Sequence, residues 1–279
     1  MAGAARSSGV LGRGPYGASD HASFGYRTDD ERVQVAAAWL ADGLRAGQRT
    51  LYVAEAPAHE LANELAGHPV LAAAMRAGTL LVHTIADLYD LSAPIDAAAQ
   101  VAGYDATVEL ALRDGFDGVR VAADITPLVL DPARRDAHLR WEHVADRYMT
   151  TRPLAAACLF DVRVVGDLGP IACSHPLRDE AHGSFGVFGT AHDRTSVEGE
   201  VDRLGSAWFE AALAGIPSED RVVDVSNLGF LDGHCAWLLQ RELERRRAAG
   251  TPLAVVGAGA VVRRVGTACG FDPRMIDAS

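Results

Sequence analysis

The chain has 279 residues and a formal net charge of −11; 49% of its residues are hydrophobic and 23% are charged. Such a composition is typical of a folded protein with room for two domains, and the negative charge argues against a nucleic-acid partner. No apolar stretch reaches the roughly 20 residues of a membrane span, so we expect no membrane partner and a cytoplasmic location.

The first half alternates helices with short apolar strands. Residues 1–20 lack the apolar core of a signal peptide and are expected to form a disordered tail. From Asp29, apolar residues recur at helical spacing up to a stop at Gly47. The expected strands then cover 49–54, 79–84, 118–125 and 154–162, and the expected helices cover 56–67, 68–78, 95–114 and 133–149. Continuous apolar strands separated by helices indicate a parallel sheet covered on both faces.

This rhythm breaks near His175, where a turn-rich segment predicts a domain boundary with a short strand and a hinge at about 176–190. The smaller unit that follows alternates strands and helices again. Its expected elements are the segment TSVEGEVD, a helix over about 204–214, the strand RVVDVS, a helix over 235–249, the strand PLAVVG and a last helix from about 260. We therefore expect an α/β fold with two domains, 21–180 and 185–279.

The residues that usually hold nucleotides or metals are missing from their usual places. The segment YVAEAPAHEL follows a strand but has no glycine run, the chain has no lysine, and Glu55 would repel a phosphate. His138 and His143 are five residues apart, about 140° off one helix face, which does not match the zinc motif H-E-x-x-H. The four scattered cysteines are expected to be buried thiols. The sequence accordingly predicts neither a metal nor a cofactor.

Charged residues gather instead around two of the expected strand ends. Asp124 and Asp161 follow the third and fourth strands, with Arg120 and Arg163 beside them, and Glu142 interrupts an amphipathic helix. Ligands bind outside the carboxyl ends of strands in open parallel sheets, whereas buried charges need partners. Two interpretations stay open: a ligand pocket, or an internal salt-bridge network in which Arg120 pairs with Glu142.

The motifs HASFGYRTDDERVQVAAAWLADGLRAGQRTLYVAE, GFDGVRVAADIT, WEHVADRY, ACLFDVRVV and SHP follow one another between His21 and Pro176. In this order they resemble the MEDS domain, the sensory domain of the dichloromethane regulator and related methylotroph and methanogen proteins. The resemblance implies a RecA/KaiC-like sheet without its nucleotide loop, and a small-molecule ligand. The positions that it carries over to a ligand site are His21, Arg120, Asp124, Glu142, Asp161 and His175; Arg163 joins them from its place beside Asp161.

The motifs VEGEVDRLGSAWFEAAL and VVDVSNLGFLDGHCAWLLQRELERRRAAGTPLAVVGAGAVVRRV, with CGF after them, resemble a STAS domain, the fold of anti-sigma-factor antagonists. In phosphorylated antagonists a partner kinase modifies a serine after an aspartate, which adds about −1.5 to −2 charges. Here Asp232 is kept as the helix cap, Gly233 stands in place of the serine, and His234 follows. We expect this corner to lack the phosphorylation switch and to keep a docking surface for a protein such as an anti-sigma factor or a kinase.

The leading hypothesis is a non-enzymatic regulator, in which a sensory domain binds a small molecule and a STAS-like domain passes its state to another protein. The alternative is an enzyme or chaperone-like catalyst acting on a small organic substrate in a biosynthetic pathway, with strand-end carboxylates and histidines doing acid–base work. A third hypothesis is a purely structural partner. A homo-oligomer is compatible with each of them.

Overall fold

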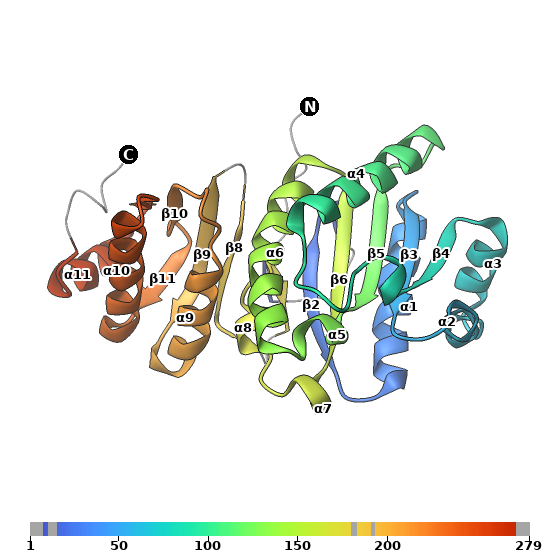
Figure 1. Cartoon of the computed structure of the whole chain (residues 1–279), viewed down its shortest axis with the longest axis horizontal. Helices are drawn as coiled ribbons and strands as arrows, with labels where there is room; N and C mark the ends of the chain where they lie inside the picture. Colours follow the sequence, from blue (N-terminus) through green and yellow to red (C-terminus); the bar gives the residue numbers. More distant parts are fainter. Residues whose placement is uncertain (1–7, 11–15, 180–182, 191–192, 272–279) are drawn as a thin grey trace.

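The computed structural model describes residues 8–10, 16–179, 183–190 and 193–271. Two β-sheets succeed each other along the chain and lie side by side, with a long helix between them (Figure 1). Sheet A has seven strands in the order β1-β7-β2-β6-β5-β3-β4, and all of its pairings are parallel. Sheet B is mixed, because β8 runs antiparallel to β9. The expected α/β class is confirmed.

The elements of the first half agree closely with the periodicity of the sequence. The strands of sheet A are β1 (Gly9–Val10), β2 (His21–Tyr26), β3 (Arg49–Ala54), β4 (Leu80–Thr84), β5 (Val119–Asp124), β6 (Leu154–Asp161) and β7 (Leu177–Arg178). The helices are α1 (Asp29–Arg45), α2 (Ala58–Leu65), α3 (Pro69–Ala77), α4 (Ala97–Arg113), α5 (Thr126–Val129), α6 (Pro132–Thr151), α7 (Val162–Val165) and α8 (Gly169–Ala172). The strands β1 and β2 and the helices α5, α7 and α8 were not expected from the pattern. One short strand was expected in the turn-rich segment after His175, where the structure has β7 and β8 (Phe185–Gly189).

The second half contains sheet B and three longer helices. The strands are β8 (Phe185–Gly189), β9 (Arg194–Val201), β10 (Val222–Asp224), β11 (Leu228–Leu231) and β12 (Ala254–Val256), and the helices are α9 (Ser206–Gly215), α10 (Gly233–Ala248) and α11 (Ala260–Ala268). Both β10 and β11 pair with β9 in parallel, one after the other along its length. Among the described residues, none of the helices combines the length and the apolar character that crossing a bilayer requires.

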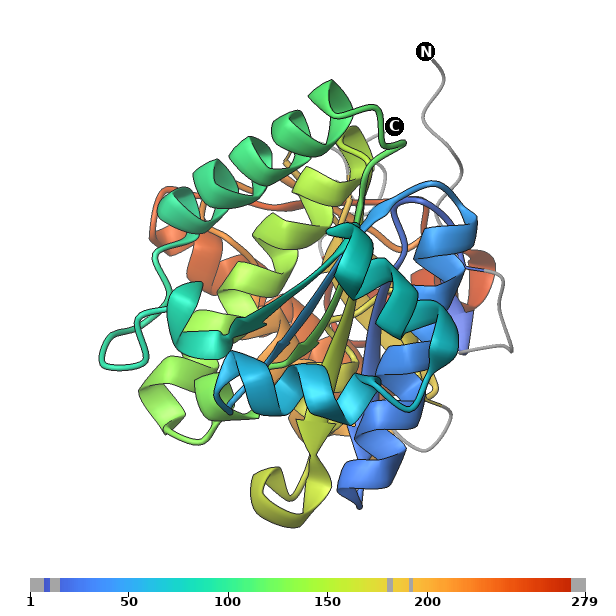
Figure 2. The ribbon, with the colours of Figure 1, turned by 90° about the vertical axis from the view of Figure 1, so that its right-hand side faces the viewer.

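Sheet A has an apolar core on each face, because successive side chains of a strand point to opposite sides. On β5, Ala122 packs toward α1, α2 and α3, whereas Val121 and Ala123 pack toward α4, α5 and α6. Figure 2 shows the strands between α1 on one side and α4 and α6 on the other. This alternation decides which polar side chains of β2, β5 and β6 meet, and it therefore positions the candidate sites.

The segment before β2 is packed rather than free. The ring of Tyr16 lies 4.6 Å from that of Trp39, Asp20 is buried, and the backbone N–H of Gly17 donates to Asp20 Oδ2 at 2.7 Å. The expectation of a disordered tail is therefore wrong for residues 16–20, which pack on α1 through Tyr16 and bond to β6 through the Asp20 carbonyl. The expectation is also wrong for Gly9 and Val10, which form β1 beside β7. Residues 1–7 and 11–15 lie outside the described residues.

The two sheets pack closely through α6 and the segment that follows β6. Arg147 on α6 lies 2.8 Å from the buried Asp220 Oδ1, and the backbone N–H of Val187 on β8 donates to the carbonyl of Cys173 at 2.6 Å. Gly189 lies so close to α6 that an added Cβ would stand 2.2 Å from the carbonyl oxygen of His143. The expected hinge falls partly on residues 180–182, outside the described residues, and stays a prediction.

Candidate functional site

A cleft of about 380 Å³ opens at the carboxyl edge of sheet A. We call it the carboxyl-edge cleft. It is lined by the ends of β2, β3, β5 and β6 and by residues of α1, α2, α5 and α7: Tyr26, Asp29, Arg32, Ala54, Glu55, Ala56, Leu61, Glu64, Asp124, Thr126, Pro127, Leu130, Asp161 and Val164. Five of these side chains are carboxylates and a single one is a guanidinium, so the cleft attracts hydrogen-bond donors and cations and repels polyphosphates.

Asp124, the last residue of β5, is the centre of the polar network in this cleft. Its Oδ2 accepts a hydrogen bond of 2.7 Å from the Tyr26 hydroxyl, and its Oδ1 accepts one of 2.7 Å from the Thr126 hydroxyl. The Arg32 Nε lies 3.8 Å from Oδ2. Burial, together with the charge of Asp124, raises the pKa of Tyr26 well above its ordinary value, so this phenol is a neutral hydrogen-bond donor.

Arg32 supplies the positive charge of the cleft from the first turns of α1. Its Nη2 donates to Glu64 Oε1 at 2.9 Å, and its Nη1 donates to the Tyr52 hydroxyl. Burial alone would lower the pKa of this guanidinium, but hydrogen bonding to Glu64 and the charges around it raise the pKa above its ordinary value. Arg32 is therefore a fixed, buried cation, held from two sides.

Asp161 lines the rim of the same cleft, and Arg163 pairs with it. Arg163 donates to both carboxylate oxygens of Asp161, at 2.8 Å from Nε and 2.7 Å from Nη2. These hydrogen bonds hold the pKa of Asp161 below its ordinary value. The Arg163 side chain is about half exposed. The structure thus places Asp124 and Asp161 at the strand ends expected for a ligand site, with Arg163 beside them.

Arg120 contacts neither the acidic residues of the cleft nor Glu142, so the expected pair of Arg120 with Glu142 is wrong. Arg120 points to the α1 face of the sheet, where its Nε donates to Gln48 Oε1 at 2.7 Å and its Nη2 donates to the Gly17 carbonyl at 2.8 Å. Glu142 lies beyond the opposite face, because α6 covers the side to which Val119 and Val121 point. Arg120 is fully buried and stacks over Trp39, so it ties the segment before β2 to the sheet.

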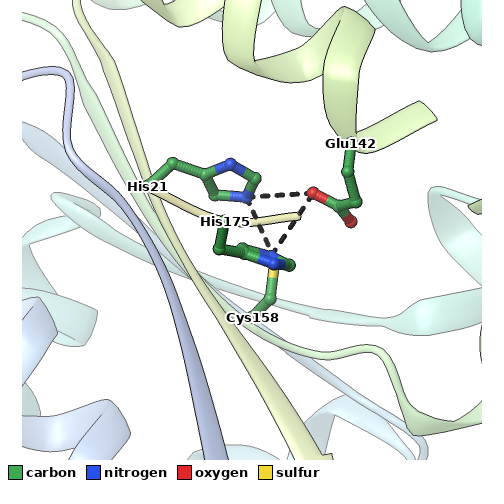
Figure 3. A group of neighbouring side chains, drawn as sticks. All are labelled: His21, Glu142, Cys158 and His175. Atoms are coloured by element: carbon green, nitrogen blue, oxygen red, sulfur yellow. Dashed lines mark hydrogen bonds and ion pairs between the residues drawn. The ribbon is translucent and has the colours of Figure 1, made fainter. Parts of the chain in front are cut away.

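Glu142 belongs to a second polar group, which we call the histidine cluster. It consists of His21 on β2, His138, Glu142 and Asp146 on α6, Cys158 on β6, and His175 after α8. Figure 3 shows four of these side chains converging from different segments. All six residues are buried, and none of them lines the carboxyl-edge cleft. His21, Glu142 and His175, three of the expected ligand-site residues, therefore meet away from that cleft.

Three histidine nitrogens of the histidine cluster lie close to the carboxylate oxygens of Glu142. Glu142 Oε1 lies 2.6 Å from His138 Nε2, and Oε2 lies 3.3 Å from His21 Nε2 and 3.4 Å from His175 Nε2. Although burial acts to raise it, the pKa of Glu142 is lowered by the charge and hydrogen bond of His138. Burial lowers the pKa of His175 to about 4, against the charge of Glu142. The network therefore combines an ionised carboxylate with at least one neutral imidazole.

The corner formed by Asp232, Gly233 and His234 lies at the start of α10. Asp232 caps the helix: its Oδ1 accepts a hydrogen bond of 2.7 Å from the Cys235 backbone N–H. A Cβ added to Gly233 would meet only the Cys269 Sγ, at 3.7 Å, so packing does not require a glycine there. The His234 ring stacks on Trp237 at 5.9 Å.

Sequence reasoning missed several residues of both sites. Arg32 follows three acidic residues, and the sequence therefore suggests a solvated helix face. In the structure its guanidinium points toward the strand ends instead. Cys158 was expected to be a buried thiol of the apolar core. Because it stands two residues before Phe160, the alternation of the strand places both side chains on the α6 face of β6, and this was the available signal that Cys158 faces α6. His138 was considered only with His143, whereas its partner in the structure is Glu142, one helical turn along α6.

Comparison with known protein families places these sites in context. The family model described as the methanogen/methylotroph, DcmR sensory domain (MEDS) matches residues 20–176, which is more than half of the chain. Both the carboxyl-edge cleft and the histidine cluster lie inside the matched segment. No curated protein matches the chain.

Proposed function

The chain belongs to the MEDS family of sensory domains, and from this premise we propose that it is a cytoplasmic regulator in which the first half binds a small molecule and the second half passes on its state. The ligand would bind in the carboxyl-edge cleft. The observation that carries this proposal is the arrangement of Asp124, Arg32 and Tyr26 at the open edge of a parallel sheet, which is where α/β folds bind their ligands.

The lining of the cleft favours a particular class of ligand. Five carboxylates against a single guanidinium suit an amine or a molecule rich in hydroxyl donors. The exposed side chains Leu130 and Val164 at the rim add apolar contact area. We infer a small organic molecule with both a hydrogen-bond-donating group and an apolar part. The scaffold would be of the RecA/KaiC kind, with the phosphate loop replaced by the acidic segment at Glu55.

For the second half we propose a STAS-like unit that docks on a protein partner such as an anti-sigma factor or a kinase. Its support is the order of strands and helices around β11 and α10, with Asp232 as helix cap. Gly233 offers no hydroxyl to phosphorylate, so the state of this unit would depend on the first half rather than on a kinase. Trp237 and Phe230, both more than a third exposed, lie on the elements that meet at this corner.

Signalling requires that the ligand bind two arrangements of the chain with different affinity, since equal affinity for both would shift nothing. The contact of α6 with sheet B offers a route. Helix α6 covers sheet A on one face, and on the other it holds the Arg147–Asp220 ion pair and the close approach to Gly189. We propose that occupation of the cleft changes this contact.

The proposal can be tested by mass spectrometry of the full-length protein under native and then denaturing conditions. We expect the wild type to release a co-purified metabolite, and Asp124→Asn to release at least tenfold less. Asp114→Asn is the matched control, because Asp114 pairs with Arg49 before the start of β5, away from the cleft. A wild type without any bound metabolite, or an Asp124→Asn protein that retains it as the control does, would contradict the proposal. Conversion of the metabolite during incubation would identify an enzyme instead.

A further inference from the structure

We propose that His21, Glu142, Cys158 and His175 form a site for a divalent transition metal of the zinc class. The four residues come from β2, α6, β6 and the segment after α8, which are far apart in sequence. One ligand atom from each lies within 4.8 Å of the others, and all four side chains are buried (Figure 3). Four protein ligands with little access for water are typical of a structural rather than a catalytic metal.

The spacing of the ligand atoms fits a tetrahedral ion. Zinc binds imidazole nitrogen and carboxylate oxygen at about 2.0–2.2 Å and thiolate sulfur at about 2.3 Å, so neighbouring ligand atoms stand about 3.3–3.6 Å apart. Here His21 Nε2 lies 3.3 Å from Glu142 Oε2 and 3.4 Å from Cys158 Sγ. His175 Nε2 lies 3.4 Å from the same carboxylate oxygen. Three edges of the tetrahedron thus already have suitable lengths.

The groups behind the ligands hold the correct atoms toward the centre. His21 Nδ1 lies 2.8 Å from Asp146 Oδ1, and His175 Nδ1 lies 2.9 Å from the Ile171 carbonyl oxygen. Both acceptors take the Nδ1 proton and leave Nε2 of each ring free to bind a cation, as outer carboxylates and carbonyls do in metalloproteins. His138 occupies the second oxygen of Glu142, so that this carboxylate would bind through Oε2 alone.

Two inner atoms of the cluster have no hydrogen-bond partner among the described residues and are suited to bind a cation. Neither Glu142 Oε2 nor His175 Nε2 makes a hydrogen bond with any described residue, although both are buried. A buried polar atom left without a partner is costly. A metal ion would satisfy both atoms at once, and the Cys158 thiol would lose its proton to the solvent as the metal–sulfur bond forms.

Soft thiolate together with imidazole favours zinc over magnesium or calcium, which prefer oxygen ligands. The inference goes beyond the proposed sensory function, because the metal site is separate from the carboxyl-edge cleft. Its role would be to join four segments of the first half and to fix the face of α6 that packs on sheet A. Loss of the metal and loss of the cleft's ligand can therefore be measured independently.

The test uses the full chain and two metals. The protein is expressed in medium supplemented with zinc, and its metal content is measured by inductively coupled plasma mass spectrometry. We expect about one zinc ion per chain. Protein unfolded in urea with a chelator is then refolded with Co²⁺. A tetrahedral site with one thiolate should give the visible bands of tetrahedral cobalt and a near-ultraviolet thiolate-to-cobalt band. Zn²⁺ should displace the cobalt and raise the melting temperature.

Two variants assign the thiolate to Cys158. Cys158→Ser should lose the charge-transfer band and at least tenfold in zinc affinity. The triple variant Cys173→Ser, Cys235→Ser, Cys269→Ser leaves Cys158 as the sole thiol and should keep the band, so that the assignment can be tested even if Cys158→Ser fails to fold. Asp146→Asn should weaken zinc binding about tenfold while the band persists. Wild type that neither retains zinc nor binds cobalt through sulfur, or a triple variant without the band, would overturn the proposal.

Discussion

The carboxyl-edge cleft and the histidine cluster both gather acidic side chains against sheet A, yet the cleft is open to solvent and the cluster is closed. In the cleft, Asp161 and Arg163 pair at a solvated rim, and a solute can replace the water around them. In the cluster, Glu142 is surrounded by imidazoles and every member is buried. The difference teaches that the covering helix, and not the residue type alone, decides whether an acidic side chain beside the sheet faces a solute or other side chains. Buried polar groups must instead be satisfied from within, or by a bound ion.

The sharpest test of this comparison is Glu142→Gln, measured in the presence of a chelator. Removing the charge from this buried network takes away the carboxylate that His21, His138 and His175 contact. We expect a loss of about 3–5 kcal/mol in the free energy of unfolding. Urea denaturation of the full chain measures it.

The matched control for this variant is Glu60→Gln. Glu60 is well exposed on α2, so the same chemical change should stay within about 0.5 kcal/mol. Equal stability of the two variants would break the comparison, because it would mean that the cluster is as accessible as the surface.

A second test concerns the opposite face of α6, where sheet B packs. Gly189→Ala would place a methyl group 2.2 Å from the His143 carbonyl oxygen, and the backbone on both sides would have to move. We expect a loss of about 1–3 kcal/mol in the free energy of unfolding. We also expect faster hydrogen exchange in α6 and β8, measured by mass spectrometry.

Gly103→Ala in α4 is the control, since an added Cβ there meets nothing within 4 Å. A helical glycine replaced by alanine should gain about 0.5–1 kcal/mol. If Gly189→Ala behaved like this control, the close contact between the two halves would be disproved.

The smallest effect is expected at the rim of the cleft. Asp161→Asn removes a solvated ion pair and should change the free energy of unfolding by about 0–1 kcal/mol at neutral pH. Because the folded-state pKa of Asp161 is lowered, its contribution is present above the ordinary aspartate pKa of about 3.9 and is lost as the pH falls through the folded value. Wild type and variant should therefore converge in acid, as followed by thermal melts over a pH series. A difference that grows in acid would contradict the lowered pKa.

The fold of the first half followed from the sequence because its strands are continuously apolar. The strand expected at 49–54 coincides with β3, and the helix expected from Asp29 coincides with the start of α1. The strand β2 was missed because His21, Ser23 and Gly25 interrupt its apolar residues. These three residues are nevertheless on one face, so the period of two was present in the sequence.

The sites were only half predictable, for a physical reason. The sequence indicates that Asp124 and Asp161 end neighbouring strands, and parallel strands end at one edge. It does not indicate to which side of the sheet Arg120 points, because that depends on which helix covers which face. Successive side chains of a strand point to opposite faces, so Arg120 points away from the face that α6 covers, whereas its neighbours Val119 and Val121 point toward it. Glu142 on α6 therefore contacts histidines instead of an arginine.

The hydrogen bond from Val187 to Cys173 has a practical meaning for anyone who wishes to divide the chain. Cys173 lies before the end of the family match at 176, yet its side chain belongs to the apolar core of sheet B. Cutting the chain at that boundary would expose apolar surface on both fragments. The second fragment would lose part of its core, and the first would carry that part into solvent. The two halves, if expressed separately at this boundary, are thus expected to aggregate, and functional tests should use the full chain.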